Sequence, residues 1–235
     1  MSQKTIETIL SPELSHQVEM KGKTVVVIDV LRATTCMVTA FMAGADHLLT
    51  FSDVEECRKS RSEGYLLAGE RNGKKIDDFD LGNSPNDYLN LGVNGKKISI
   101  TTTNGTQAIE SSKDAEKILI GSFLNFSALV EKCQELNNPL VLYCAGWKGR
   151  VNLEDSLLAG AIIERAGGSF ELLDDSSYLA VEFYQKEKDD LIGILQNASH
   201  YKRLSGLSQS NDLETCVSMD KTIIVPEVKG NRIEA

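Results

Sequence analysis

The hydrophobic pattern of the chain is dominated by short apolar runs, each followed by small polar residues. Residues 25–28 read Val-Val-Val-Ile, and residues 140–143 read Leu-Val-Leu-Tyr. A run that is apolar at every position, rather than at every second one, is typical of a strand buried on both faces of a parallel sheet. The runs that predict strands lie at residues 25–28, 66–68, 98–100, 117–121, 140–143 and 222–225.

Helical segments with start and stop signals lie between these runs. Thr34 or Thr35 can cap a helix from about residue 36 that ends at Gly44, and Ser84 can cap one with Pro85 in its first turn. Further helices are expected to begin near residues 53, 105, 126 and 152, and most of 174–200 also has a helical pattern.

Strands that alternate with helices predict parallel pairing, with helices on both faces of the sheet. The expected fold class is therefore α/β, in three layers, with a largely parallel central sheet. No linker, repeat or low-complexity tract interrupts the 235 residues, so we expect a single domain over residues 1–235.

Residues 98–109 form the most informative loop, because an apolar strand runs into six small polar residues and then into a helical segment. Backbone N–H groups at a helix start are unpaired and lie at the positive end of the helix dipole, so this turn suits phosphate, sulfonate or carboxylate. An ordinary strand-to-helix connection explains the same residues, with Thr103 or Asn104 as a cap and Gly105 in an unusual conformation. Loops that follow parallel strands gather at one edge of the sheet, so several of them can share a ligand. The substrate-binding candidates are Asn83, Ser84, Thr102, Thr103, Asn104, Gly105, Thr106 and Gly146.

The same strand ends also bring carboxylates together. Asp29 and Glu70 each follow a predicted strand, while Glu154 and Asp155 lie near a helix start. Beside a phosphate dianion each carboxylate is repelled, by about 4 kcal/mol at 4 Å and an effective dielectric of 20. A divalent cation removes this conflict, and oxygen ligands suit Mg²⁺. The candidate metal ligands are Asp29, Glu70 and Asp155. As alternatives, Asp155 can cap its helix, Asp29 can cap its own loop, and Glu70 can pair with Arg71.

Cys144 and Arg150 are separated by five residues directly after a predicted strand. Cysteine phosphatases use this spacing, with a thiolate that attacks phosphorus and an arginine that binds the phosphate oxygens. The flanking residues depart from that arrangement, since Tyr143 stands where a histidine usually precedes the cysteine and Val151 where a hydroxyl residue follows. Water therefore remains the alternative nucleophile. The catalytic candidates are Asp29, Arg32 and Cys144.

Motifs and charge disfavour several other classes. The net charge of −9 argues against broad contact with nucleic acid or an anionic membrane. The P-loop, G-x-G-x-x-G and G-x-S-x-G patterns do not occur, which disfavours P-loop NTPases, dinucleotide-binding folds and serine α/β-hydrolases. His16, His47 and His200 have neither metal nor triad spacing, so we expect them to be structural or exposed.

Cysteine usage and the ends of the chain bear on the compartment. The five cysteines are an odd number without a C-x-x-C pair, which predicts free thiols in a reducing cytoplasm. The first residues lack an apolar export segment, and no run approaches a membrane span. The expected partner is a small anionic phosphate ester, with neither nucleic acid nor membrane. A homo-oligomer is compatible with the sequence.

A series of blocks spans nearly the whole chain and can be compared with known families as one ordered set. The blocks are Val-Val-Ile-Asp-Val-Leu-Arg-Ala-Thr-Thr (26–35), Ala-Gly-Glu-Arg (68–71), Phe-Asp-Leu-Gly-Asn-Ser-Pro (79–85), Thr-Thr-Asn-Gly-Thr (102–106), Gly-Ser-Phe-Leu-Asn (121–125), Cys-Ala-Gly (144–146) and Leu-Glu-Asp-Ser-Leu-Leu-Ala-Gly (153–160). Together they closely resemble the 2-phosphosulfolactate phosphatase family. Residues 174–198 have no matching block.

The resemblance implies a three-layer α/β fold and a Mg²⁺-dependent acid-type phosphatase. Such an enzyme converts 2-phosphosulfolactate to sulfolactate and phosphate, a step of coenzyme M biosynthesis, and accepts related phosphate esters of 2-hydroxy acids. A non-catalytic binder of phosphorylated or sulfonated metabolites is the alternative. A binder would need the loop at 102–106 and Arg32, but it has no use for Asp29, Glu70 and Asp155, so these carboxylates favour hydrolysis.

Overall fold

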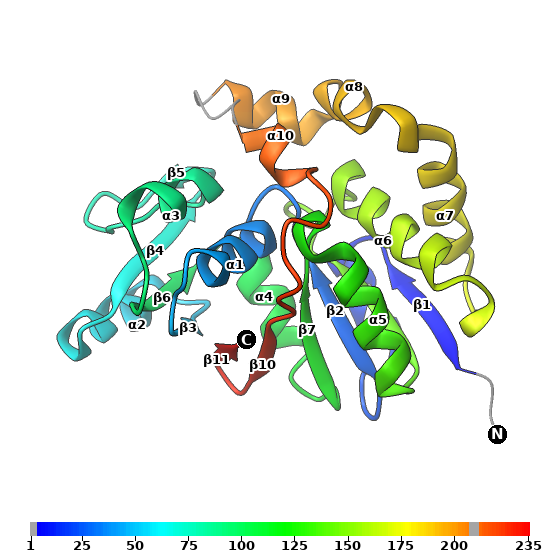
Figure 1. The fold of residues 1–235 in the computed structure, drawn as a ribbon, viewed down its shortest axis with the longest axis horizontal. Coiled ribbons are helices and arrows are strands. Elements are labelled where there is room, and N and C mark those ends of the chain that lie inside the picture. The colour runs from blue at the N-terminus through cyan, green and yellow to red at the C-terminus, as the bar shows by residue number, and fades with distance from the viewer. Residues whose placement is uncertain (1–3, 207–211) are drawn as a thin grey trace.

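The central feature of the computed structural model, which describes residues 4–206 and 212–235, is one 11-stranded sheet (Figure 1). The strand order is β5-β4-β6-β3-β11-β10-β7-β2-β8-β1-β9. The strands are β1 (Thr5–Ile9), β2 (Thr24–Ile28), β3 (His47–Thr50), β4 (Leu66–Arg71), β5 (Lys74–Lys75), β6 (Lys97–Thr101), β7 (Lys117–Gly121), β8 (Leu140–Cys144), β9 (Glu171–Leu172), β10 (Glu227–Lys229) and β11 (Arg232–Glu234).

Two blocks of parallel strands make up most of the sheet. One block contains β4, β6 and β3, and the other contains β7, β2, β8, β1 and β9. The antiparallel hairpin of β10 and β11 joins them, because β10 pairs with β7 and β11 pairs with β3. Figure 1 shows this hairpin in dark red between the two blocks. The predicted α/β class with a largely parallel sheet is confirmed.

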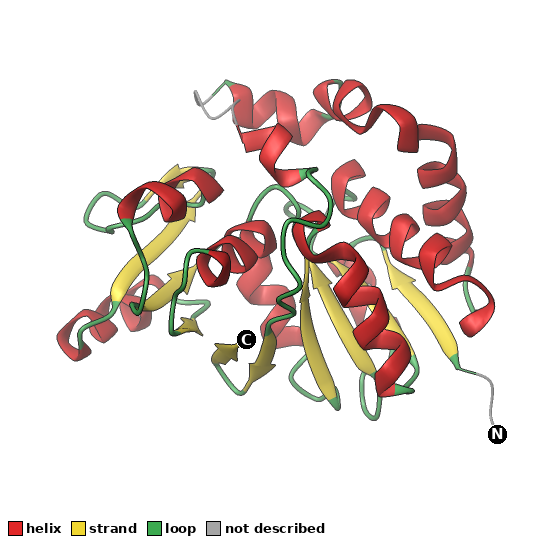
Figure 2. Ribbon diagram, viewed as in Figure 1, coloured by secondary structure: helices red, strands yellow, loops and turns green. Residues whose placement is uncertain are grey.

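Helices cover both faces of the second block (Figure 2). Val26 and Ile28 of β2 belong to a core shared with α5, α6 and α7, whereas Val25 and Val27 belong to a core shared with α1 and α4. Successive side chains of a strand point to opposite faces, so the continuous apolar run supplies both cores at once. The helices are α1 (Ala33–Met42), α2 (Val54–Lys59), α3 (Pro85–Leu91), α4 (Gly105–Ser111), α5 (Phe126–Leu136), α6 (Leu153–Ala166), α7 (Asp175–Glu187), α8 (Leu191–Gln196), α9 (Ser199–Ser205) and α10 (Leu213–Cys216).

The predicted strand at residues 222–225 is wrong. These residues lie beside the loop that comes after β7, and Asn125 Nδ2 in that loop donates to the carbonyl of Ile224 at 3.0 Å. The amide of Ile120 donates to the carbonyl of Pro226 at 2.9 Å, and Ile223 is 87% exposed. The β-branched run therefore lies beside the sheet without forming a ladder, and β10 begins only after the proline, which has no N–H to donate.

The helix starts differ in detail from the prediction. The helix α1 begins at Ala33, with Arg32 at the N-cap position and no side-chain cap. Thr34 instead accepts a hydrogen bond from the amide of Asp29 at 3.0 Å, and Asp29 Oδ1 accepts one from the amide of Ala33 at 3.2 Å. Ser84 and Pro85 do start α3, but the Ser84 hydroxyl makes no capping bond. The side chains of Asp29 and Thr34 therefore stabilise the turn between β2 and α1.

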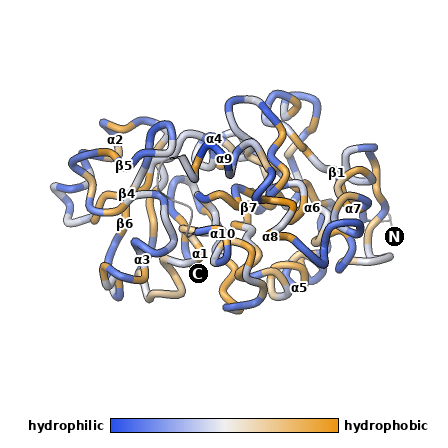
Figure 3. The backbone as a smooth tube through the Cα atoms, turned by 90° about the horizontal axis from the view of Figure 1, so that it is seen from above, coloured by the Kyte–Doolittle hydropathy of each residue, from blue (hydrophilic) through white to orange (hydrophobic). Residues whose placement is uncertain are grey.

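The polar periphery and apolar centre are clear when the molecule is viewed from above (Figure 3). Hydrophobic segments concentrate along β7 and α6 in the middle of the molecule. Across residues 4–206 and 212–235, no helix combines the length and the hydropathy that crossing a bilayer requires.

Candidate active site

The loops that follow β2, β6 and β8 meet the end of β4 at a small cavity, as the strand pattern predicted. Figure 1 shows α9 and α10, in orange, above the ends of these strands. The free space in the cavity is about 20 Å³, which is roughly room for one water molecule. The residues that line it are Asp29, Leu31, Arg32, Glu70, Gly73, Asn83, Thr103, Asn104, Trp147, His200, Arg203 and Leu204.

Glu70 joins two walls of the cavity. Its Oε1 accepts a hydrogen bond from the amide of Thr103 at 2.7 Å, and its Oε2 accepts one from the amide of Gly73 at 2.6 Å. The alternative pairing with Arg71 is not observed, because that guanidinium donates to backbone carbonyls and to the hydroxyl of Thr101. Each carboxylate oxygen of Glu70 keeps a second lone pair for a further ligand.

Asp29 is a buried carboxylate at the exit of β2. Burial raises its pKa from 3.8 to about 6, and the nearby charges of Glu70 and Glu154 act in the same direction. The charge of His200 and the hydrogen bond from the amide of Ala33 lower the pKa but do not compensate. A carboxylate that resists ionisation in a cleft is typical of a functional site, where a cation or a proton relieves it.

Arg32 lies against Asp212, with both side chains almost fully buried. Asp212 also accepts hydrogen bonds from the hydroxyl of Ser84 at 2.6 Å and from the side-chain amide of Asn86 at 3.0 Å. This pair therefore fixes the guanidinium in the cavity wall, and Asp212 connects the start of α10 to the start of α3. Ser84, predicted to bind substrate, instead donates its hydroxyl to Asp212 in this network.

Asp155 does not line the cavity. Its Oδ1 accepts a hydrogen bond from the amide of Val30 at 2.9 Å, and its Oδ2 accepts one from the amide of Gly146 at 3.0 Å. Burial and the neighbouring carboxylates of Glu154 and Asp29 raise the pKa of Asp155 well above its usual value. Asp155 therefore connects the exits of β2 and β8, a bracing role that the sequence did not suggest.

The predicted set of three metal-binding carboxylates is not assembled. Among residues 4–206 and 212–235, no group of three His, Cys, Asp or Glu side chains has the geometry to hold a metal ion. Asp29 and Glu70 share the cavity, but Asp155 lies behind its wall. The reason is that two backbone N–H groups at the ends of β2 and β8 donate hydrogen bonds to the two carboxylate oxygens of Asp155.

The loop at 102–106 divides into binding candidates and internal supports. Thr103 and Asn104 line the cavity, whereas Thr102 and Thr106 bond to each other, with the Thr106 hydroxyl donating to the Thr102 carbonyl at 2.8 Å. Gly105 is buried, and a Cβ there would lie 2.6 Å from the Cβ of Ala33 and 3.1 Å from Oδ2 of Asp29. Only glycine lets the start of α4 approach Asp29 this closely.

Two buried oxygens make the cavity suitable for a cation. Oδ1 of Asn83 and Oγ1 of Thr103 have no hydrogen-bond partner among the described residues, although both atoms are buried. Buried polar atoms normally have a partner, so an unpaired pair of oxygens in one cavity indicates a missing ligand. With Asp29 and Glu70 these residues form an oxygen-only donor set, which fits a hard divalent cation held by one or two carboxylates and by substrate oxygens.

Cys144 is fully buried in the core beneath α6 and does not line the cavity. Burial raises the pKa of its thiol well above the usual value, and Asp155 and Glu154 raise it further. Gly146 also lies outside the cavity wall, where its φ of 57° and its approach to the carbonyl of Arg150 shape a tight turn. The thiolate nucleophile therefore has neither the exposure nor the electrostatic support that such groups need.

Replacing Cys144 with Ser should leave the rate of phosphate release within about tenfold of the wild type, because a buried thiol makes packing contacts only. A Ser nucleophile in place of a catalytic thiolate would instead lose several orders of magnitude, as its hydroxyl ionises far less readily. Steady-state kinetics on a phosphate ester, with iodoacetamide treatment of the wild type as a second measurement, distinguish the two results. Rapid inactivation by iodoacetamide that phosphate prevents would contradict the expectation.

His200 is one of the cavity residues that the sequence did not predict. It is 5% exposed and lines the cavity from α9, where its Nδ1 contacts Oε1 of Glu154 and lies 3.1 Å from the side-chain amide of Asn152. The ring lies nearly parallel to Trp147, with 6.4 Å between ring centroids. Glu154 and His200 are 46 positions apart, so no local spacing reveals their contact.

Arg203 completes the cover of the cavity. Its guanidinium lies 4.3 Å from the centroid of the Trp147 ring, and its buried Nε has no hydrogen-bond partner in the described part of the chain. Burial lowers the pKa of this guanidinium. Together Arg203 and Arg32 supply two positive groups to a cavity that also holds two carboxylates.

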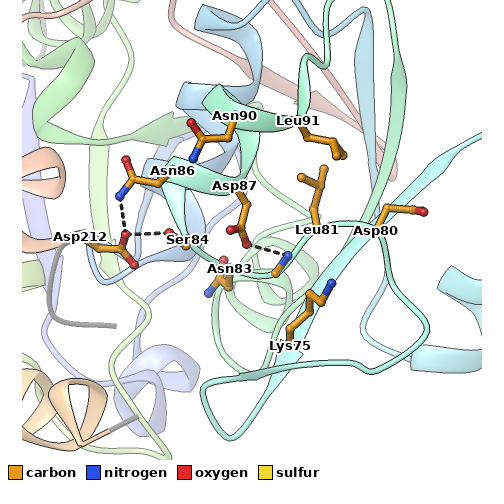
Figure 4. Close-up of a pocket in the computed structure, with 11 residues that line it drawn as sticks. Lys75, Asp80, Leu81, Asn83, Ser84, Asn86, Asp87, Asn90, Leu91 and Asp212 are labelled. Atoms are coloured by element: carbon orange, nitrogen blue, oxygen red, sulfur yellow. Dashed lines mark hydrogen bonds between the residues drawn. The ribbon is translucent and has the colours of Figure 1, made fainter. Parts of the chain in front are cut away.

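A larger open cavity shares Asn83 with the small one (Figure 4). Its free space is about 570 Å³, and its lining includes Lys75 and the three carboxylates Asp80, Asp87 and Asp212. Asp212 is paired with Arg32 and Asp80 with Arg61, so the remaining charged groups of this lining, Asp87 and Lys75, give no net positive charge to attract a polyanionic ester. The small cavity, with its two arginines, is therefore the better candidate site for an anion.

The comparisons with known proteins identify the family of the chain. A family model described as 2-phosphosulpholactate phosphatase matches residues 9–231. A protein of Caldanaerobacter subterraneus subsp. tengcongensis is 40% identical over 218 residues, which cover 90% of each chain. One of Thermotoga maritima is 43% identical over 204 residues, covering 87% of this chain and 88% of the relative. One of Clostridium acetobutylicum is 38% identical over 232 residues, covering 97% and 99%. All three relatives carry the name "Probable 2-phosphosulfolactate phosphatase". The chain therefore belongs to the 2-phosphosulpholactate phosphatase family.

Proposed function

We propose that this protein is a Mg²⁺-dependent phosphatase that hydrolyses 2-phosphosulfolactate to sulfolactate and phosphate, as a step of coenzyme M biosynthesis. Related phosphate esters of 2-hydroxy acids are further substrates. The observation that carries the proposal is the small cavity, in which oxygen donors for a cation lie beside two arginines and a histidine. The family membership supports the same reaction class.

The donor set of the cavity suits Mg²⁺. Asp29 and Glu70 supply carboxylate oxygens, and Asn83 and Thr103 supply the two unpaired buried oxygens. A bound Mg²⁺ would neutralise charge that develops on the phosphoryl oxygens and orient the ester. It would also relieve the electrostatic penalty that keeps the pKa of Asp29 high.

The arginines suit the anionic groups of the substrate. Arg32 is held in place by Asp212, so its guanidinium is oriented before the ester arrives. Arg203, on α9, lies over the Trp147 ring and supplies a second positive group to the cavity lining. A fixed guanidinium binds phosphate or sulfonate oxygens better than a flexible lysine, because little conformational freedom is lost on binding.

The cytoplasm is the proposed compartment. The five cysteines of the chain are free thiols in the structure. Free thiols in this number fit a reducing environment.

Chelation with EDTA should abolish phosphate release, and added Mg²⁺ should restore it. Phosphate release from 2-phospholactate, a generic phosphate ester of a 2-hydroxy acid, is the measurement, with Ca²⁺ as the comparison cation. Turnover also excludes the non-catalytic binder, which would bind the ester without releasing phosphate. Full activity after thorough chelation would contradict the metal requirement, and no turnover of any ester would contradict the phosphatase assignment.

A further inference from the structure

His200 and Glu154 form a buried pair that faces the candidate site without a part in the metal or anion binding described above. Glu154 is completely buried, and its Oε1 contacts Nδ1 of His200. The ring is thereby fixed in orientation, with Trp147 alongside it. The other ring nitrogen, Nε2, makes no hydrogen bond with the described residues, and the ring lines the cavity.

A histidine that a carboxylate holds in this way can carry a proton to a reacting atom. A histidine whose Nδ1 is fixed by a carboxylate presents Nε2 to a reacting atom in one orientation, as in other sites where a carboxylate orients an imidazole. The charged groups around the ring are Glu154 in contact, Asp29 and Glu70 across the cavity, and Arg203 and Arg32 on its walls. The charge of Arg32 is balanced by its contact with Asp212.

The chemistry of the proposed substrate needs such a group. The ester oxygen of a 2-phospho-hydroxyacid is bonded to an alkyl carbon, and an alkoxide is a poor leaving group in water. A proton delivered to that oxygen as the bond breaks removes the unfavourable charge, and general acid catalysis of this kind contributes about 10²–10⁴-fold.

We propose that His200, oriented by Glu154, is the general acid that protonates the leaving oxygen of the ester. This inference rests on the proposed phosphatase function. The P–O bond to the ester oxygen breaks, its electron pair stays on that oxygen, and the proton of Nε2 is transferred there to give the alcohol. The oxygen of a water molecule forms the new bond to phosphorus, and the proton that this water loses passes to solvent. Solvent then returns a proton to Nε2.

The test compares two phosphate esters that differ in their need for a proton. His200→Asn retains a side-chain N–H near the position of Nδ1 to bond Glu154, but it has no atom at the position of Nε2. We expect kcat/KM for 2-phospholactate to fall about 10²–10⁴-fold. For p-nitrophenyl phosphate, whose phenolate leaves without protonation, kcat/KM should stay within about tenfold. His16→Asn is the matched control, since His16 is exposed outside the cavity, and both rates should be unchanged.

Equal losses for the two esters would overturn the proposal, because His200 would then act on binding or folding rather than on the leaving group. Unchanged rates for both would overturn it as well. If His200→Asn does not fold, Glu154→Gln retains the shape of the pair without its charge and should lose activity selectively on the alkyl ester. Failure of the phosphatase function itself is distinguishable, since the wild type would then release phosphate from neither ester.

Discussion

Replacing Asp29 with Asn should strongly reduce phosphatase activity and, at the same time, make the metal-free protein more stable at pH 7. The carboxylate lies in the cavity where a cation and the ester are expected, so its loss should reduce kcat/KM on the order of 10²–10³-fold. The Asn side chain can still accept the hydrogen bond from the amide of Ala33 through its oxygen. Local structure should therefore survive the change.

The gain in stability follows from the raised pKa of Asp29. Between the ordinary value of 3.8 and about 6 the folded protein holds a proton that the unfolded chain has lost. Stability therefore decreases as the pH rises through this window, and above it the buried carboxylate costs about 3 kcal/mol. Asn carries no charge, so Asp29→Asn should be more stable by about this amount at pH 7 and equal to the wild type below about pH 4.

Urea denaturation at pH 4 and pH 7, in the presence of chelator, measures the free energy of unfolding of both proteins. Asp114→Asn is a suitable control, since Asp114 is exposed on the surface and its replacement should change neither activity nor stability. A variant that is less stable than the wild type at pH 7 would show that the Asp29 carboxylate stabilises the strand exit instead.

Replacing Arg32 with Ala should be damaging in two separate ways. Asp212 would remain as a buried charge without its partner, which lowers the free energy of unfolding by about 3–5 kcal/mol. If Arg32 also binds the transferred phosphate, kcat/KM should fall on the order of 10²–10³-fold beyond any effect of partial unfolding. Circular dichroism at the assay temperature identifies the folded fraction, and kinetics on that fraction give the second effect.

Asp212→Asn separates these two roles. The change breaks the same ion pair but leaves the guanidinium in the cavity wall, and the Asn oxygen can still accept from Ser84 and Asn86. Asp212→Asn should therefore lose stability while keeping kcat/KM within about tenfold of the wild type. Equal loss of activity in the two variants would assign Arg32 to structural support alone.

The sequence predicted the parts of the site that follow from local patterns. Asp29, Glu70 and Asn104 lie next to apolar strands, so the rule that parallel strand ends gather ligands places them correctly. The β-branched residues 222–225 show the limit of that pattern, because their backbone is held by a loop rather than by a neighbouring strand.

The contacts that the sequence did not predict join positions that are distant in the chain. Arg32 and Asp212 are 180 positions apart, and Glu154 and His200 are 46 apart. Asp155 was expected to bind metal because carboxylates suit cations, but two peptide N–H groups at strand ends satisfy a carboxylate equally well. Composition and spacing cannot distinguish these partners, since the choice depends on which strands become neighbours.

The cavity beneath α9 has room for about one water molecule in this structure, with His200, Arg203 and Leu204 forming its cover. A phosphate ester is larger than this space, so we expect these side chains to move when it binds. Binding that waits for a conformational change is slower than ordinary association, so the second-order rate constant for substrate capture should lie below the usual 10⁵–10⁷ M⁻¹s⁻¹. If the same side chains also cover the phosphate that hydrolysis leaves behind, we expect its release, rather than bond cleavage, to set the maximal turnover rate.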